Sequence, residues 1–120
     1  MSIAKPTDIK LHRKSRLLEI VFDDGMRFEL PCEYLRVYSP SAEVKGHGPG
    51  QGTLQTGKES INIESLRPVG NYAIAPTFSD GHNSGIYSWE YLYELGVRQE
   101  ELWRDYLDRL AVAGFRGDLG

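Results

Sequence analysis

The stretch that decides the fold is "VFDDGMRFELPCEYL", residues 21–35, which returns in altered form as "TFSDGHNSGIYSWEYL", residues 77–92. Both copies run a strand-like segment ending in Phe into an acidic residue plus Gly, then a second strand-like segment, then Glu-Tyr-Leu. Gly supplies the positive φ of a tight turn at little steric cost, so Asp-Gly between alternating segments indicates a hairpin. Each copy therefore predicts a strand, a turn, a strand and a short helix.

Duplication explains the repeat physically. One hairpin with one helix leaves a hydrophobic face uncovered, whereas two such units can stack and share a core. The copies differ by one residue between the turn Gly and Glu-Tyr-Leu, so their register is approximate. We predict an α+β fold: two antiparallel β-hairpin units form a small sheet core, with a short helix after each unit and a C-terminal amphipathic helix.

The flanking sequence adds strands. Alternation predicts strands over residues 9–12, 16–22 and 26–30, the last with Met26, Phe28 and Leu30 inward. A further strand is expected at "INIESL", residues 61–66, followed by a turn at "RPVGN" and a strand at "YAIAPTF". Pro76 lacks a backbone donor, which places that strand at an edge or a bulge. "HNSGIY", residues 82–87, is expected to return as its partner strand.

Three helices are expected. Pro31 suits the first position of one, and Ser88 can cap a second that Gly96 ends. The third covers "RQEELWRDYLDRLA", residues 98–111, and should lie over the sheet. Its apolar face consists of Leu102, Trp103, Tyr106, Leu107 and Leu110.

Length and charge restrict the function. A chain of 120 residues fits one domain, expected over residues 1–113, with a flexible tail over residues 114–120. The net charge of −3 gives no electrostatic footprint for nucleic acid or an anionic membrane, and we interpret the basic run "KLHRKSR", residues 10–16, as solvated surface. Residues 1–10 contain no apolar signal-peptide core, and no apolar run is long enough to span a membrane, so we expect a cytoplasmic protein.

The segment from Ser39 to Ser60 is rich in Gly, Pro and small polar residues and reads as a long loop. Within it lies "GHGPGQG", which lacks the Lys and Ser or Thr of a phosphate-binding loop. Two interpretations stay open: a contact for an anion or a peptide, or a plain connector. The candidate contact residues are His47, Gly48, Pro49, Gly50 and Gln51.

Metal and redox chemistry have weak signals. The three histidines, His12, His47 and His82, are far apart in sequence, so a metal site would have to gather distant segments. The lone Cys32 excludes an internal disulfide, and a single cysteine at a helix start is either a reactive thiol or a small buried side chain.

Aromatic residues gather after the second hairpin turn. Tyr87, Trp89, Tyr91 and Tyr93 alternate where strand gives way to helix, so part of this set should lie near the surface. Such rings favour protein contacts because they give large contact areas at low entropy cost.

Three phrases together carry a resemblance: "LPCEYLRVYSPSAEVKGHGPGQ", "INIESLRPVGNYAIAPTFSDGH" and "SGIYSWEYLYELG". Over about residues 6–96 the chain resembles the gamma-butyrobetaine hydroxylase-like N-terminal domain, a domain of unknown function. Members of this length are stand-alone bacterial proteins. Related domains precede iron- and 2-oxoglutarate-dependent hydroxylases or are fused to Mrp-type ATPases that carry iron–sulfur clusters.

The resemblance also implies a comparison of metal ligands. In the hydroxylases the domain holds a structural zinc with three cysteines and one histidine, and the cysteine positions fall here on Ser39, Ser41 and Val44. Only the histidine position, His82, keeps a ligand. Zinc prefers thiolate and imidazole ligands, so the same site is not expected.

We therefore expect a non-enzymatic cytoplasmic accessory domain that contacts a protein partner, which the resemblance suggests is an Mrp-type iron–sulfur carrier ATPase or an oxygenase. The catalytic oxygenase motifs belong to a different domain. The expected contact surface combines residues 47–51 with Tyr87 and Trp89, beside His82. No cofactor is predicted; the alternative is an iron- or zinc-binding protein or small metalloenzyme that uses His82, His47 and Cys32. An oligosaccharide- or peptide-binding module is a third option.

Overall fold

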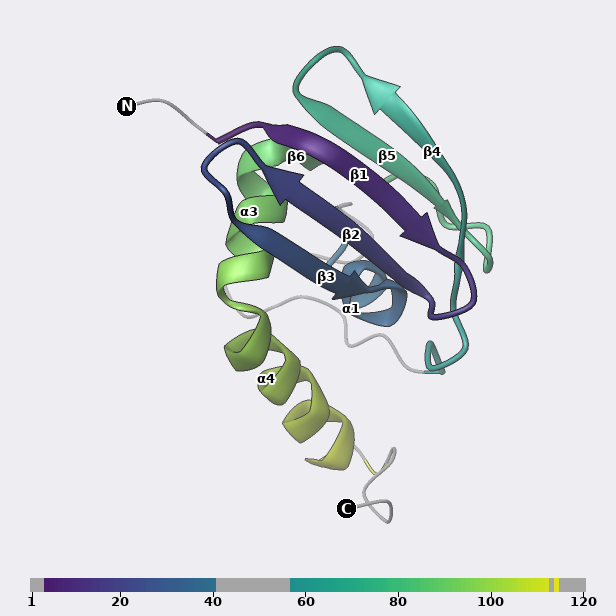
Figure 1. The fold of residues 1–120 in the computed structure, drawn as a ribbon. Helices are drawn as coiled ribbons and strands as arrows, with labels where there is room; N and C mark the ends of the chain where they lie inside the picture. The colour runs from purple at the N-terminus through teal and green to yellow at the C-terminus, as the bar shows by residue number, and fades with distance from the viewer. Residues whose placement is uncertain (1–3, 41–56, 113, 115–120) are drawn as a thin grey trace.

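The computed structural model describes residues 4–40, 57–112 and 114. A first antiparallel sheet orders its strands β1 (Pro6–His12), β2 (Leu17–Phe22) and β3 (Arg27–Pro31), and the chain then enters α1 (Cys32–Val37). A second orders β4 (Ile63–Val69), β5 (Ala73–Phe78) and β6 (Tyr87–Ser88), followed by α3 (Trp89–Val97) and α4 (Gln99–Val112). The predicted α+β class is confirmed, with three strands in each unit (Figure 1).

The two units repeat the same turn. In each, the N–H of the last Phe donates to the carbonyl four residues later, at 2.8 Å from Phe22 and 2.9 Å from Phe78. The turn glycine donates back to the Phe carbonyl, at 3.0 Å for Gly25 and 2.9 Å for Gly81. Both glycines have φ close to +90°, a region that L side chains avoid. The duplication inferred from sequence therefore extends to the backbone geometry.

The repeat also covers the strands that precede each hairpin. β1 and β4 each contain a register shift, which indicates a β-bulge. The shift lies at Thr7 in β1, opposite the end of β2, and at Glu64 in β4, opposite the end of β5. The first residue of each helix donates its N–H to the residue just before the second strand: Cys32 to Arg16 at 2.8 Å, and Trp89 to Tyr72 at 3.0 Å. Each unit is thus a three-stranded meander plus a helix.

A reciprocal pair of tyrosines joins the units. Tyr34 in α1 donates its hydroxyl to the carbonyl of Leu95 at 2.6 Å, and Tyr91 in α3 donates to the carbonyl of Tyr38. Each acceptor lies four residues after the other tyrosine. Tyr34 is fully buried and belongs to one core that draws side chains from both sheets, from α1 and from α3. Neither unit therefore has a separate core.

Several predicted boundaries need correction. Met26 is 41% exposed because it lies in the turn and not on the inner face. The residues "RPV", expected in a turn, extend β4 to Val69, and the turn covers residues 70–72. Only Tyr87 and Ser88 pair with β5, so residues 82–86 form no strand. Pro76 lies beyond that pairing, where β5 is an edge as predicted.

The helices also differ from expectation. Ser88 caps α3 as predicted, with its hydroxyl accepting from the Tyr91 N–H, but the helix continues through Gly96 to Val97. In α4, Tyr106 and Leu110 are buried, whereas Leu107 is exposed. These two α4 side chains pack with Val37 of α1 and not over the sheet. Figure 1 shows that α4 runs away from the strands.

Gly96 is required because the Phe28 ring fills the space beside it. A Cβ at residue 96 would lie 2.4 Å from the nearest ring carbon. Gly96→Ala should therefore lower the free energy of unfolding by about 1–3 kcal/mol, although Ala is the better helix former. Urea unfolding measures the loss. Val97→Ala, at an exposed position, should change little, and adding Phe28→Leu to Gly96→Ala should restore part of the loss; equal stability of wild type and Gly96→Ala would contradict this packing.

Candidate functional site

A polar cluster surrounds the second hairpin turn. The Asp80 carboxylate accepts from Arg36 Nε at 2.9 Å, from Lys58 Nζ at 2.7 Å and from the His82 N–H at 3.0 Å. His82 Nε2 lies 2.9 Å from the Ser39 hydroxyl oxygen. The cluster joins the end of α1, the turn after β5 and the residues just before β4. It therefore ties together segments that lie far apart in sequence.

The charges in this cluster favour an ionised Asp80. Partial burial raises the pKa of Asp80, but hydrogen bonds from Lys58, the His82 N–H and Arg36 outweigh it and lower the pKa to about 2. Arg36 is nearly buried, with 9% of its side chain exposed. Its Nη1 atom is buried and has no hydrogen-bond partner among the described residues. Arg36 consequently depends on Asp80 for charge compensation.

The resemblance placed a cysteine ligand at Ser39 and a histidine ligand at His82, and the structure brings these two positions together. Ser41 and Val44 lie outside the described residues. Within residues 4–40, 57–112 and 114, no group of three or more His, Cys, Asp or Glu side chains could hold a metal ion. In this pair a hydroxyl faces the imidazole where the resemblance places a thiolate.

Cys32 lies apart from this cluster. Its side chain is fully buried at the start of α1, and Sγ is 3.8 Å from Asn62 Oδ1. Burial raises the pKa of the thiol to about 11, whereas a helix N-terminus alone would lower it. Cys32 is therefore a protonated core side chain, which is the inert alternative of the sequence interpretation.

The structure describes only part of the predicted contact surface. Residues 47–51 and the tail from residue 115 lie outside the described residues. Tyr87 is fully buried and donates its hydroxyl to the Leu35 carbonyl, so its predicted place on the surface is wrong. The alternation that suggested exposure places Tyr87 on the inner face of β6. Trp89 is half-buried and remains a surface candidate.

Trp89 borders an open cavity of about 500 Å³, here called the Trp89 groove, which is lined by Lys5, Pro6, Thr7, Asp8, Ile9, Asn71 and Trp89. The indole Nε1 donates to the Asn71 carbonyl at 2.8 Å, which fixes the orientation of the ring. One wall is the beginning of β1, an edge strand. An oriented indole beside a strand edge suits the binding of a peptide segment.

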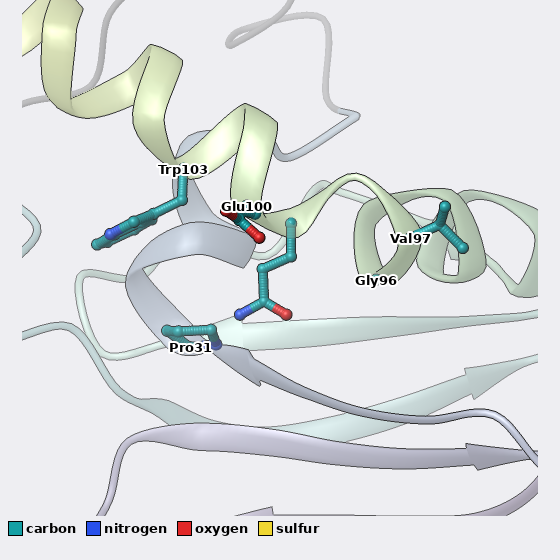
Figure 2. A pocket seen from close by; sticks show the side chains of 6 residues that line it. Pro31, Gly96, Val97, Glu100 and Trp103 are labelled. Carbon is teal, nitrogen blue, oxygen red and sulfur yellow. The ribbon is translucent and has the colours of Figure 1, made fainter.

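A second cavity of about 440 Å³ lies where α3 gives way to α4, lined by Pro31, Gly96, Val97, Gln99, Glu100 and Trp103. Figure 2 shows Trp103 and Glu100 on α4 facing Pro31 across this space. This cavity was not predicted from the sequence, where Trp103 was expected only as part of the apolar face of the last helix. The signal available in the sequence was a Trp three residues after Glu100, close to Gly96, where one helix was expected to end.

No helix in the described part of the chain is both long and apolar enough to cross a membrane.

The Asp80 cluster has a pH signature. A folded-state pKa below the ordinary value gives stability that is present above about pH 4 and is lost as pH falls toward 2. Asp80→Asn should lower the free energy of unfolding by about 2 kcal/mol at pH 7, since it also leaves buried Arg36 without its carboxylate. At pH 3, the difference in the free energy of unfolding between wild type and variant should be roughly half of its value at pH 7. Urea unfolding at both pH values checks this.

Asp24→Asn is the matched control. Asp24 holds the same turn position, and one of its carboxylate oxygens accepts from the neutral hydroxyl of Tyr93 at 2.6 Å. Asp24→Asn should lower the free energy of unfolding by less than Asp80→Asn does, because no buried cation loses its carboxylate partner. Equal losses in the two variants would argue against the role given to Arg36.

The chain is similar to two proteins whose structures were determined by NMR in solution. The first is 55% identical, with a TM-score of 0.80, and the match covers 92% of this chain and 83% of that one. The second is 45% identical, with a TM-score of 0.81 and coverage of 95% and 90%.

A crystal structure is also similar: a protein of unknown function of the DUF971 family from Acidithiobacillus ferrooxidans. It is 39% identical, with a TM-score of 0.65, and the match covers 77% of this chain and 92% of that one. No curated protein matches the chain. The family model described as gamma-butyrobetaine hydroxylase-like, N-terminal, matches residues 9–93. The chain therefore belongs to the gamma-butyrobetaine hydroxylase-like N-terminal domain family.

Proposed function

We propose that this chain is a non-catalytic accessory domain of the cytoplasm that binds a partner protein through a surface that includes the Trp89 groove. The observation that carries the proposal is the groove itself, where a half-buried indole is held in one orientation beside an edge strand. A fixed aromatic side chain loses little entropy on binding, so it can anchor a partner.

The class of partner comes from the family. Its name refers to the N-terminal region of an iron-dependent hydroxylase, and the resemblance links related domains to Mrp-type iron–sulfur carrier ATPases. We accordingly propose an iron–sulfur carrier ATPase or an iron-dependent oxygenase as the partner. Association through a groove of this size would bury only part of a standard interface, so neighbouring surface must contribute.

Partner capture tests this proposal. The full chain, immobilised and exposed to native cell extract, should enrich an iron–sulfur carrier ATPase or an iron-dependent oxygenase, identified by mass spectrometry. Trp89→Ala should reduce the recovered partner at least about tenfold, as expected for the loss of an anchor worth about 2 kcal/mol. Circular dichroism verifies that the variant is folded.

The control for capture is Ile86→Ala. Ile86 is an exposed apolar residue, 47% accessible, that does not line the groove. Its substitution should leave recovery unchanged. If both variants recover the partner as well as wild type, the groove is not the contact surface.

Metal binding is the second candidate, favoured by the meeting of Ser39 and His82 at positions where the resemblance places zinc ligands. Metal analysis of protein purified without an affinity tag separates the two functions. The proposal of an accessory domain predicts less than about 0.1 equivalents of iron or zinc, because a hydroxyl is a poor substitute for a thiolate ligand. A stoichiometric metal content that His82→Ala abolishes would instead establish the metal-binding function.

A further inference from the structure

The duplication provides two equivalent positions at which the beginning of an edge strand meets a loop of the other unit. In one, β4 begins beside residues 13–16, the loop between β1 and β2. In the other, β1 begins beside residues 70–72, the turn between β4 and β5. The equivalence follows from the matched bulges at Thr7 and Glu64. The two positions can therefore be compared residue by residue.

The first position is closed by an arginine of the chain itself. The Arg13 guanidinium donates to the carbonyl of Glu64, the bulge residue of β4. In return, the Asn62 side-chain amide donates to the Arg13 carbonyl at 3.1 Å. One arginine thus supplies both a donor and an acceptor to the strand edge. We call this arrangement the closed cleft.

The second position is the Trp89 groove, and it stays open for a structural reason. The loop that closes the first position has four residues between the paired His12 and Leu17. Its equivalent has only the three residues between Val69 and Ala73, "GNY", and contains no arginine. Asn71 reaches the rim of the groove, where its carbonyl accepts from Trp89. The cavity borders Thr7, the residue equivalent to Glu64, which Arg13 contacts in the closed cleft.

From this comparison we propose that the Trp89 groove binds an arginine side chain on an exposed segment of the partner protein. The inference rests on the proposed interaction function and specifies the chemistry of its partner. The guanidinium takes the place that Arg13 takes in the closed cleft and donates to the carbonyl of Thr7, the residue equivalent to Glu64.

The groove differs from the closed cleft in ways that suit an arginine from outside. Trp89 replaces Cys32 as the first residue of the helix, and an indole face attracts a guanidinium by cation–π interaction. Asp8 supplies a carboxylate that is 49% exposed on the groove wall, and among the described residues it forms an ion pair with exposed Lys10 at 3.5 Å. Lys5 lies at the other end of the lining segment, so the Asp8 end is the one expected to hold the cation.

Peptide titration of the ¹⁵N-labelled full chain tests the proposal by NMR. The probes are acetyl-Ala-Arg-Ala-amide and the same peptide with citrulline, which keeps the shape of arginine without its charge. The arginine peptide should shift the Trp89 indole N–H and the Asp8 amide signals in a saturable way. The citrulline peptide should bind at least about fivefold more weakly.

Two variants complete the test. Asp8→Asn should weaken binding of the arginine peptide by about threefold, whereas Glu64→Gln, at the equivalent bulge of the closed cleft, should leave it unchanged. Equal affinity for both peptides, or shifts confined to other parts of the chain, would overturn arginine recognition. If that occurs while Trp89→Ala still abolishes capture of the partner, the interaction function stands and only the arginine assignment fails.

Discussion

The fold depends on the exchange of hydrogen bonds between Tyr34 and Tyr91. Carbonyl groups at the end of a helix have no hydrogen-bond donor within that helix. Each tyrosine hydroxyl donates to such a carbonyl at the helix end of the other unit. Burial raises the pKa of both phenols, to about 12 for Tyr91, so both hydroxyls remain donors through the physiological range. Each unit thus completes the helix end of the other, and the shared core follows from that constraint.

Once the two units are matched, the departures from the repeat become informative. Phe28 packs on Gly96, whereas the equivalent pair brings Gly85 against Ser39. This exchange of a ring for a glycine makes room for the Ser39–His82 pair, where the resemblance places zinc ligands. The other departure is the shorter turn at residues 70–72, which leaves the Trp89 groove open. Both candidate sites therefore occur where the second unit departs from the first.

Local sequence rules predicted much of this structure. The Asp-Gly turns, the cap at Ser88 and the amphipathic character of α4 depend on neighbouring residues, and all three are present. Features that depend on contacts between units were not predictable in the same way. Gly96 reads as a helix end until the Phe28 ring is seen beside it, and the alternation around Tyr87 does not reveal which face is covered. The groove escaped prediction because it results from a difference in loop length between paired strands.

Native-state hydrogen exchange tests the central claim, the mutual dependence of the two units, most directly. If the hydrogen bonds of Tyr34 and Tyr91 join the units into one cooperative structure, the slowest-exchanging amides of β2 and of β5 should have the same free energy of opening. That value should equal the free energy of global unfolding. Both values should fall together in Tyr34→Phe and in Tyr91→Phe. A lower opening free energy in one sheet, with the other unaffected, would contradict the account.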